Sequence, residues 1–225
     1  KVLYSTQADT TEYSAADFFT AEQLPDKLVA LKVDRNELFI FGERSTEVWF
    51  LAGADLDSPF VFRTSLPRGA VSKRSVKSCD GTIVFAGKSP TGEVGVYRLE
   101  GYTPKKISTN EIDRLIESES DPSVIKAAAY GRQGHSFYCL KGSDWTRTYD
   151  AATGEWHTRE SYGLSVWRAE YSLSAWNKII FTDQETGKLL RLADDTFTED
   201  GGVMVMQITT PFLHAFPQGG IVDRA

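Results

Sequence analysis

The sequence has few cysteines and no long apolar run. Cys79 and Cys139 are the two cysteines among 225 residues, which is too few for a disulfide framework. Both lie inside apolar, strand-like segments, so we expect two buried free thiols, with a single disulfide as the alternative. No stretch approaches 18 consecutive apolar residues, so the sequence predicts no membrane-spanning helix.

Positive charge is also in deficit. The chain has 25 Lys and Arg against 31 Asp and Glu, a formal net charge of -6. Proteins that bind nucleic acid or anionic membranes usually carry a basic face, so we expect no membrane and no sequence-specific nucleic acid as partners. Two small clusters remain as candidate phosphate contacts, although neither has interleaved aromatic residues. They are Lys73, Arg74 and Lys77, and Lys105 and Lys106.

Helical periodicity is scarce. The sequence predicts one short helix insertion, near residues 110–119, where Ser108 and Glu111 form a capping-box pattern. The apolar stripe that follows consists of Ile112, Leu115 and Ile116. Asp-Pro at 121–122 ends the pattern. A second, shorter helix is predicted near residues 15–22.

Strand-like segments fill most of the chain, and they repeat. Aromatic residues make up 12% of the sequence and favour strands. An apolar segment without polar alternation recurs four times, as ELFIFG (37–42), TIVFAG (82–87), SFYCLK (136–141) and KIIFTD (178–183). Each is preceded by a segment with smaller side chains and followed by a polar turn, a third strand and a shorter fourth strand, which in the last unit is TFTED (196–200).

A unit of four antiparallel strands in about 45 residues is typical of a β-propeller blade. Blades stack face to face, which explains why the second strands are apolar on both faces, and small residues such as Ala127, Ala128 and Ala129 suit the crowded axis. We therefore expect an all-β, single-domain propeller over 1–225, with five blades. The blades are 26–66, 69–109, 123–161 and 164–201, and a composite blade in which 203–215 plus 1–20 close the ring.

The acid-rich turn at Glu43, Arg44 and Glu47 is a candidate for a catalytic carboxylate pair with a guanidinium. Five-bladed propellers include glycosidases that place carboxylates near the axis, but this turn lies between second and third strands, so we expect a solvated bend. Asp34 and Asp80 follow inner strands, in stretches that read as ordinary hairpin turns.

The histidines are too dispersed for a metal motif. They are His135, His157 and His214. We therefore assign no catalytic, cofactor-binding or metal-binding residue, expect no cofactor, and do not expect an enzyme. Two alternatives stay open. A carbohydrate-binding or glycosidase-like propeller could stack sugars on Trp49, Trp145, Trp167 and Trp176. A kelch-like protein-interaction module is suggested by YDAATGEW (149–156).

Several segments resemble a known family. They are DFFTAEQLPDKLVALKVDRNELFIFGERSTEVW (17–49), GYTPKKIST (101–109), GHSFYCL (134–140), YDAATGEWHTRES (149–161) and ITTPFLHA (208–215). Together they resemble the packaged-DNA stabilisation, or tail accessory (hub), proteins of short-tailed double-stranded DNA phages. A Gly-Cys pair typical of that family is missing from LPRGAVSKRSVKS (66–78), so no functional residue is carried over.

The resemblance implies a structural phage or prophage protein of the virion tail, made in the bacterial cytoplasm. It implies that the protein joins the tail machine below the portal and helps keep the packaged genome in, by blocking a channel sterically. The implied partners are other tail or portal-vertex proteins, further copies of the chain among them. Family members are longer than 225 residues, so we expect this chain to be a piece of a longer protein.

Overall fold

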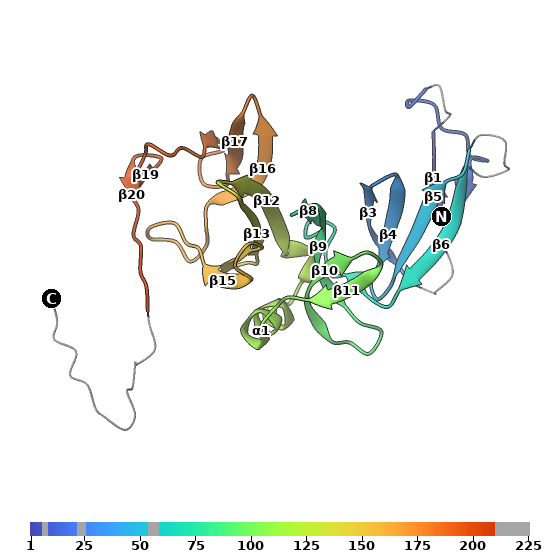
Figure 1. Ribbon diagram of the computed structural model, residues 1–225, viewed down its shortest axis with the longest axis horizontal. Coiled ribbons are helices and arrows are strands. Elements are labelled where there is room, and N and C mark those ends of the chain that lie inside the picture. Colours follow the sequence, from blue (N-terminus) through green and yellow to red (C-terminus); the bar gives the residue numbers. More distant parts are fainter. Residues whose placement is uncertain (6–8, 22–25, 54–58, 210–225) are drawn as a thin grey trace.

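The computed structural model describes residues 1–5, 9–21, 26–53 and 59–209 (Figure 1). The fold is mostly β, and every strand pairing in the described residues is antiparallel. The described ranges contain one α-helix, α1 (Asn110–Ser118), and one 3-10 turn, Pro122–Val124. No helix in these ranges has the length and apolar character needed to cross a bilayer.

Two sheets have the four-stranded form expected from the repeat. The first sheet has the order β3 (Leu28–Asp34), β4 (Glu37–Gly42), β5 (Thr46–Leu51), β6 (Phe60–Leu66). The third sheet has the order β12 (Lys126–Arg132), β13 (His135–Lys141), β14 (Thr146–Asp150), β15 (Glu155–Thr158). In both, chain order equals spatial order, which is the meander of a propeller blade.

The second and fourth sheets depart from four strands. In the second sheet, β7 (Gly69–Ala70) and β8 (Lys77–Cys79) both pair with β9 (Thr82–Lys88), followed by β10 (Val94–Glu100) and β11 (Thr103–Lys106). The fourth sheet has three strands, β16 (Ala169–Ala175), β17 (Lys178–Asp183) and β18 (Leu189–Arg191). The prediction that TFTED is its fourth strand is wrong, because β19 (Thr198–Glu199) pairs with β20 (Gly202–Val203) across a tight turn.

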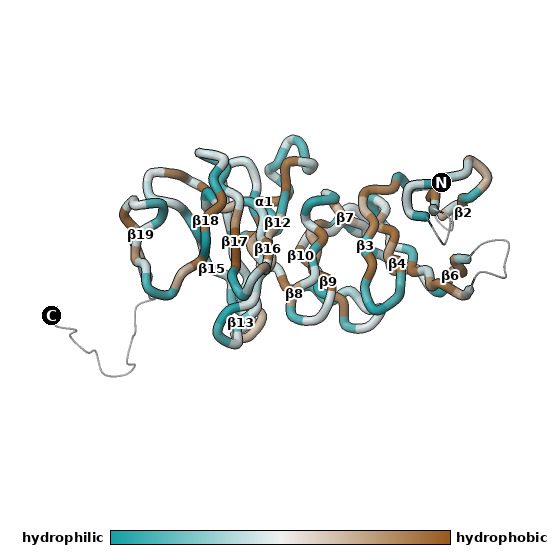
Figure 2. Tube along the Cα trace, turned by 90° about the horizontal axis from the view of Figure 1, so that it is seen from above, coloured by the Kyte–Doolittle hydropathy of each residue, from teal (hydrophilic) through white to brown (hydrophobic). Residues whose placement is uncertain are grey.

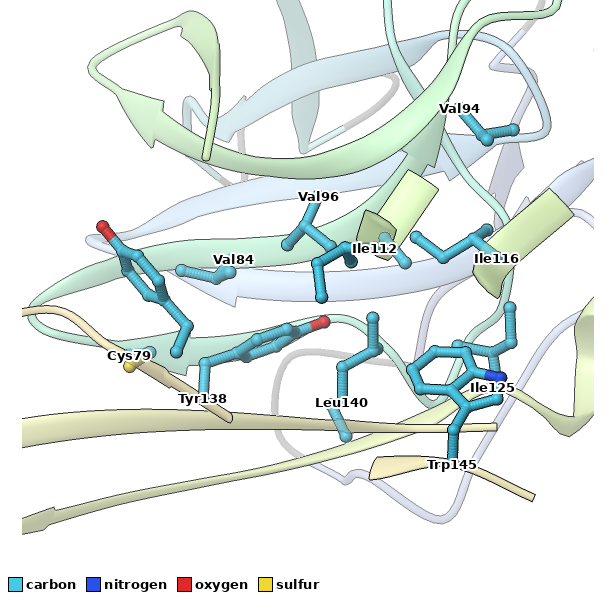
Figure 3. Packing of buried hydrophobic residues seen from close by; sticks show 13 residues of the cluster. Cys79, Val84, Val94, Val96, Ile112, Ile116, Ile125, Tyr138, Leu140 and Trp145 are labelled. Atoms are coloured by element: carbon cyan, nitrogen blue, oxygen red, sulfur yellow. The ribbon is translucent and has the colours of Figure 1, made fainter. Parts of the chain in front are cut away.

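In the first three sheets most residues of the second and third strands are buried, because these sheets pack against one another. Phe41 of the first sheet meets Phe85 of the second with ring centroids 5.0 Å apart. Between the second and third sheets, Val84 and Val96 face Tyr138 and Leu140 (Figure 3). Apolar residues line strands such as β3, β4 and β17, whereas several connecting turns are hydrophilic (Figure 2). This packing accounts for the missing polar alternation in the sequence.

The inner strand of the third sheet carries small side chains, as expected. Ala127 and Ala128 are buried, and Ala129 is partly buried. The strand β12 contacts the inner strands on either side, β8 and β16. Small residues therefore allow three inner strands to approach closely.

The helix α1 lies where the sequence predicts it, but its cap differs. Thr109 is the N-cap and its hydroxyl accepts the amide of Ile112. Ser108 instead donates to Asp113 at 2.5 Å and accepts the amide of Val96 at 2.9 Å, so it ties the helix to β10. The shorter helix predicted near residues 15–22 is wrong in its described part, where β2 (Phe18–Phe19) forms.

The terminal segments lie at opposite ends of the molecule (Figure 1). At one end β1 (Val2–Leu3) pairs with β2, and Val2 and Phe19 cover Ile40 and Trp49 of the first sheet. At the other end residues 204–209 continue from β20 without a strand partner. Within the described residues the two termini do not pair, and residues 210–215 of the expected closing blade lie outside them. Ring closure stays a prediction.

Candidate interaction surfaces

The turn between β4 and β5 is exposed but rigidly held. The side chains of Glu43 and Arg44 face solvent, as predicted. The three backbone amides of residues 43–45 donate to the carboxylate of Asp26 over 2.7 to 3.0 Å. Hydrogen bonds to an ionised carboxylate are stronger than neutral ones, so Asp26 fixes the shape of this turn.

Glu47 was predicted to lie at the same solvated bend, and this prediction is wrong. Its side chain belongs to β5 and the residue is 4% exposed. The indole Nε1 of Trp49 donates to its Oε2 at 2.9 Å. The two residues lie two positions apart on one strand and so share a face, and a buried indole N–H requires an acceptor.

The same pairing of Trp with Glu recurs at the third and fourth sheets. Trp145 Nε1 donates to Glu119 at 2.8 Å, and Trp167 Nε1 donates to Glu199 at 2.9 Å. Trp49, Trp145 and Trp167 are buried, whereas Trp176 is 84% exposed. Three of the four tryptophans proposed for sugar stacking are therefore buried, and within the described ranges the four do not converge with acids on one open site.

In each of the four larger sheets of the described residues, a residue that precedes the first strand binds the turn between the second and third strands. Beyond Asp26, these contacts are Arg68 to Glu93 at 3.4 Å, Glu119 to the amide of Ser143 at 2.8 Å, and Arg168 to Asp183 at 2.5 and 2.7 Å. The partners are 15 to 25 residues apart in sequence. No local pattern marks such pairs, so the sequence alone does not predict these four residues.

Asp34 and Asp80 lie at hairpin turns, as predicted. The turn residues have positive φ at both central positions in all four first hairpins, at 35–36, 80–81, 133–134 and 176–177. This is the two-residue geometry that matches strand twist. Arg98 forms an ion pair with Asp80 at 2.9 Å, and Arg35 donates to the carbonyl of Gly81 at 2.7 Å, so the first two hairpins are joined.

The histidines occupy structural positions. His135 Nδ1 lies 2.6 Å from the Asp150 carboxylate, and burial lowers the pKa of His157, which packs beside Phe137. His214 lies outside the described residues. In the part of the chain that the structure describes, no group of three or more His, Cys, Asp or Glu could hold a metal ion.

Both cysteines are buried free thiols, as the sequence predicts. Burial raises the pKa of Cys79 to about 12 and also raises the pKa of Cys139. A thiol becomes nucleophilic as its thiolate, so neither group is suited to chemistry at neutral pH.

Buried hydrogen bonds link neighbouring sheets. Tyr138 of the third sheet donates to the carbonyl of Ser75 at 2.8 Å, and Ser72 donates to the carbonyl of Ile125 at 2.5 Å. Between the third and fourth sheets, the ammonium of Lys141 donates to the carbonyl of Trp167 at 2.6 Å. Such bonds are directional, so they fix the angle between sheets that apolar packing alone would leave loose.

The two predicted basic clusters differ in their surroundings. Lys105 pairs with Glu100 at 3.0 Å, and Lys106 pairs with Glu93 and Asp113 at 2.9 Å, so this cluster is neutralised. Lys73, Arg74 and Lys77 instead line an open groove of about 630 Å³ between the N-terminal segment, the first sheet and the second sheet.

The chain has matches among solved structures and among protein families. A search of curated proteins found no match. Among solved structures, the crystal structure of the WD40 domain of SCAP from fission yeast matches at 15% identity and a TM-score of 0.35, over 81% of this chain and 49% of that chain. The chain thus spans about half the length of that protein.

A family model described as "Bacteriophage P22 Gp10, beta-propeller", of the phage stabilisation family, matches residues 1–197. That match confirms the predicted resemblance and the reading as a phage structural protein rather than an enzyme. The chain belongs to the phage stabilisation family of bacteriophage P22 Gp10.

Proposed function

We propose that this chain is the rigid propeller of a tail protein that joins the phage tail machine below the portal and helps retain the packaged genome by steric blockage. The family match over residues 1–197 carries the proposal. The hydrogen bonds between sheets and the fixed turns support it, because a plug in a channel must resist deformation.

The proposal includes the number and boundaries of the blades. The chain forms one domain over 1–225 with blades at 26–66, 69–109, 123–161 and 164–201, and 203–215 plus 1–20 close the ring as a fifth. Two observations support closure. The N-terminal segment already covers the first sheet as a neighbouring blade would, and the fourth sheet exposes Leu173 and Leu189, at 62% and 70%.

The partners in this proposal are other tail or portal-vertex proteins, including further copies of the chain, and the location is the virion tail. The turn at Glu43 and Arg44 is a suitable docking element. Its side chains are free to meet a partner, while Asp26 holds its backbone in one conformation, so little entropy is lost on binding.

A phage genome from which this gene is deleted provides the test. Packaged particles should form and then lose DNA, measured as nuclease-sensitive DNA released from purified particles. Supplying the wild-type protein in trans should restore retention, and labelled protein should be found at the tail vertex. Deletion particles that hold their genome as firmly as wild type contradict the proposal.

A further inference from the structure

A groove lies between the N-terminal segment, the first sheet and the start of the second sheet. Its walls are residues 1–3, Leu28–Leu31 of β3, and Lys73, Arg74 and Lys77. We call it the basic groove. The groove is wide open to solvent and has a volume of about 630 Å³.

The cations of the basic groove lack acidic partners. Lys73, Arg74 and Lys77 form no ion pair with any described residue, and the ammonium of Lys1 lies 3.7 Å from the ring centroid of Phe18. Burial and the nearby charge of Lys32 lower the pKa of Lys77. In a chain with net charge -6, this concentration of unneutralised positive charge favours an anionic occupant.

The groove follows the free edge of a strand. Four consecutive residues of β3, Leu28–Leu31, line the groove, where the register of β3 with β4 shifts between Leu28 and Ala30. Among the described residues β3 pairs with β4 alone, so its other edge has no strand. The inner strands β8, β12 and β16 contact one another in series, whereas β3 makes no comparable contact with β8.

The floor of the groove is aliphatic. Leu28 and Leu31 are exposed, Leu31 at 56%, and Val2 and Val29 lie beside them. Nucleic acid offers no aliphatic surface to cover these groups and binds single strands through stacked aromatics, which do not line this groove. A peptide can supply both acidic and aliphatic side chains, alternating along an extended strand.

We propose that the basic groove binds an extended peptide of another protein, which adds as a strand to the free edge of β3. Its acidic side chains face the cations of residues 73–77, and its aliphatic side chains cover Leu28 and Leu31. Strand addition is a recurrent mode of peptide recognition, in which backbone bonds supply affinity and alternate side chains supply specificity. The proposal goes beyond genome retention and does not depend on it.

Binding is measured by fluorescence anisotropy on the full chain, with a labelled peptide of alternating Glu and Val, about ten residues long. The double variant Lys73→Ala/Arg74→Ala removes two exposed cations and should weaken binding about tenfold or more, increasingly so at low salt. The matched control Lys105→Ala/Lys178→Ala removes the same charge elsewhere and should leave affinity unchanged. Leu31→Glu should also weaken binding, since it places an acid on the floor.

Three further probes test strand addition and the choice of an acidic peptide as the occupant. A peptide of the same sequence with alternate backbone amides N-methylated should bind much more weakly, because it cannot form the ladder; equal binding contradicts strand addition. A peptide of alternating Lys and Val should not bind. An oligonucleotide of equal charge that binds more tightly than the acidic peptide, and does so through Lys73 and Arg74, overturns the choice of occupant.

Discussion

At the residue scale, the side chain of Asp26 alone holds the β4–β5 turn in one conformation. One carboxylate accepts three backbone amides of residues 43–45 and the hydroxyl of Ser45. Glu119 acts in the same way on Ser143 and adds the indole of Trp145. In both sheets an acid that sequence reading would assign to solvent is a structural acceptor.

Replacing Asp26 by Ala should therefore destabilise the fold by about 1 to 3 kcal/mol, because three amides lose their acceptor at a partly buried turn. Urea unfolding followed by tryptophan fluorescence measures the free energy of unfolding. Glu43→Ala is the matched control, since its exposed side chain should change stability by less than about 0.5 kcal/mol. Equal losses in both variants would show that Asp26 has no special role.

Lys141 makes the stability of the fold depend on pH. The residue is buried between the third and fourth sheets, and burial lowers its pKa from 10.5 to about 8. Between these values the unfolded chain binds a proton that the folded chain does not, so this group makes the fold more stable as pH rises. Below about pH 8 both states carry the charge and the full penalty of burying it remains.

The free energy of unfolding should therefore change with pH at different slopes in wild type and in Lys141→Met. From about pH 8 to about pH 10 the free energy of unfolding of wild type should rise relative to that of the variant. Urea titrations at several pH values measure both, and other titrating groups cancel in the difference. Parallel curves would mean that Lys141 keeps an ordinary pKa in the fold.

At the level of the elements, Gly69 couples two sheets. It begins the second sheet, and a Cβ at this position would lie closer to the backbone of residues 42–44 than atoms can approach. The β4–β5 turn is thus enclosed by Asp26 on one side and by Gly69 on the other. Backbone cannot move aside as a flexible side chain can, so this contact requires glycine.

Gly69→Ala should accordingly separate the first and second sheets and destabilise the chain by about 1 to 3 kcal/mol, the usual cost of overpacking. Gly131→Ala is a suitable control, because its added methyl would meet only ordinary contacts and its φ is not positive. Thermal unfolding by circular dichroism compares the two. A Gly69 variant that melts like the Gly131 variant would disprove the coupling.

The strands themselves were largely predictable. The four apolar second strands coincide with β4, β9, β13 and β17. In β4, β9 and β13 burial between packed sheets explains the apolar run. What escaped prediction depends on pairings that residue type alone does not specify. Glu47 is buried by its bond to Trp49, the fourth sheet lacks its last strand because β19 pairs with β20, and the residues that hold the turns act across 15 to 25 positions.

For the whole molecule, the exposed face of the fourth sheet decides the shape in solution. Leu173 and Leu189 lie on one face of that sheet through their pairing with β17. If the ring closes as proposed, this face is covered, and small-angle scattering should give a radius of gyration near the value for a compact chain of this length, about 17 Å. The variant Leu173→Glu/Leu189→Glu should enlarge it. A wild-type value well above the compact estimate, unchanged in the variant, would contradict closure.

The contact between Gly69 and the β4–β5 turn also bears on biosynthesis. A chain leaves the ribosome from its N-terminus, and domains begin to fold as they emerge. Asp26 is available before that turn is made, but Gly69 emerges only after the whole first sheet. The turn of the first sheet is therefore enclosed only after the start of the second sheet has been synthesised. The sheets thus assemble in the order in which they are translated.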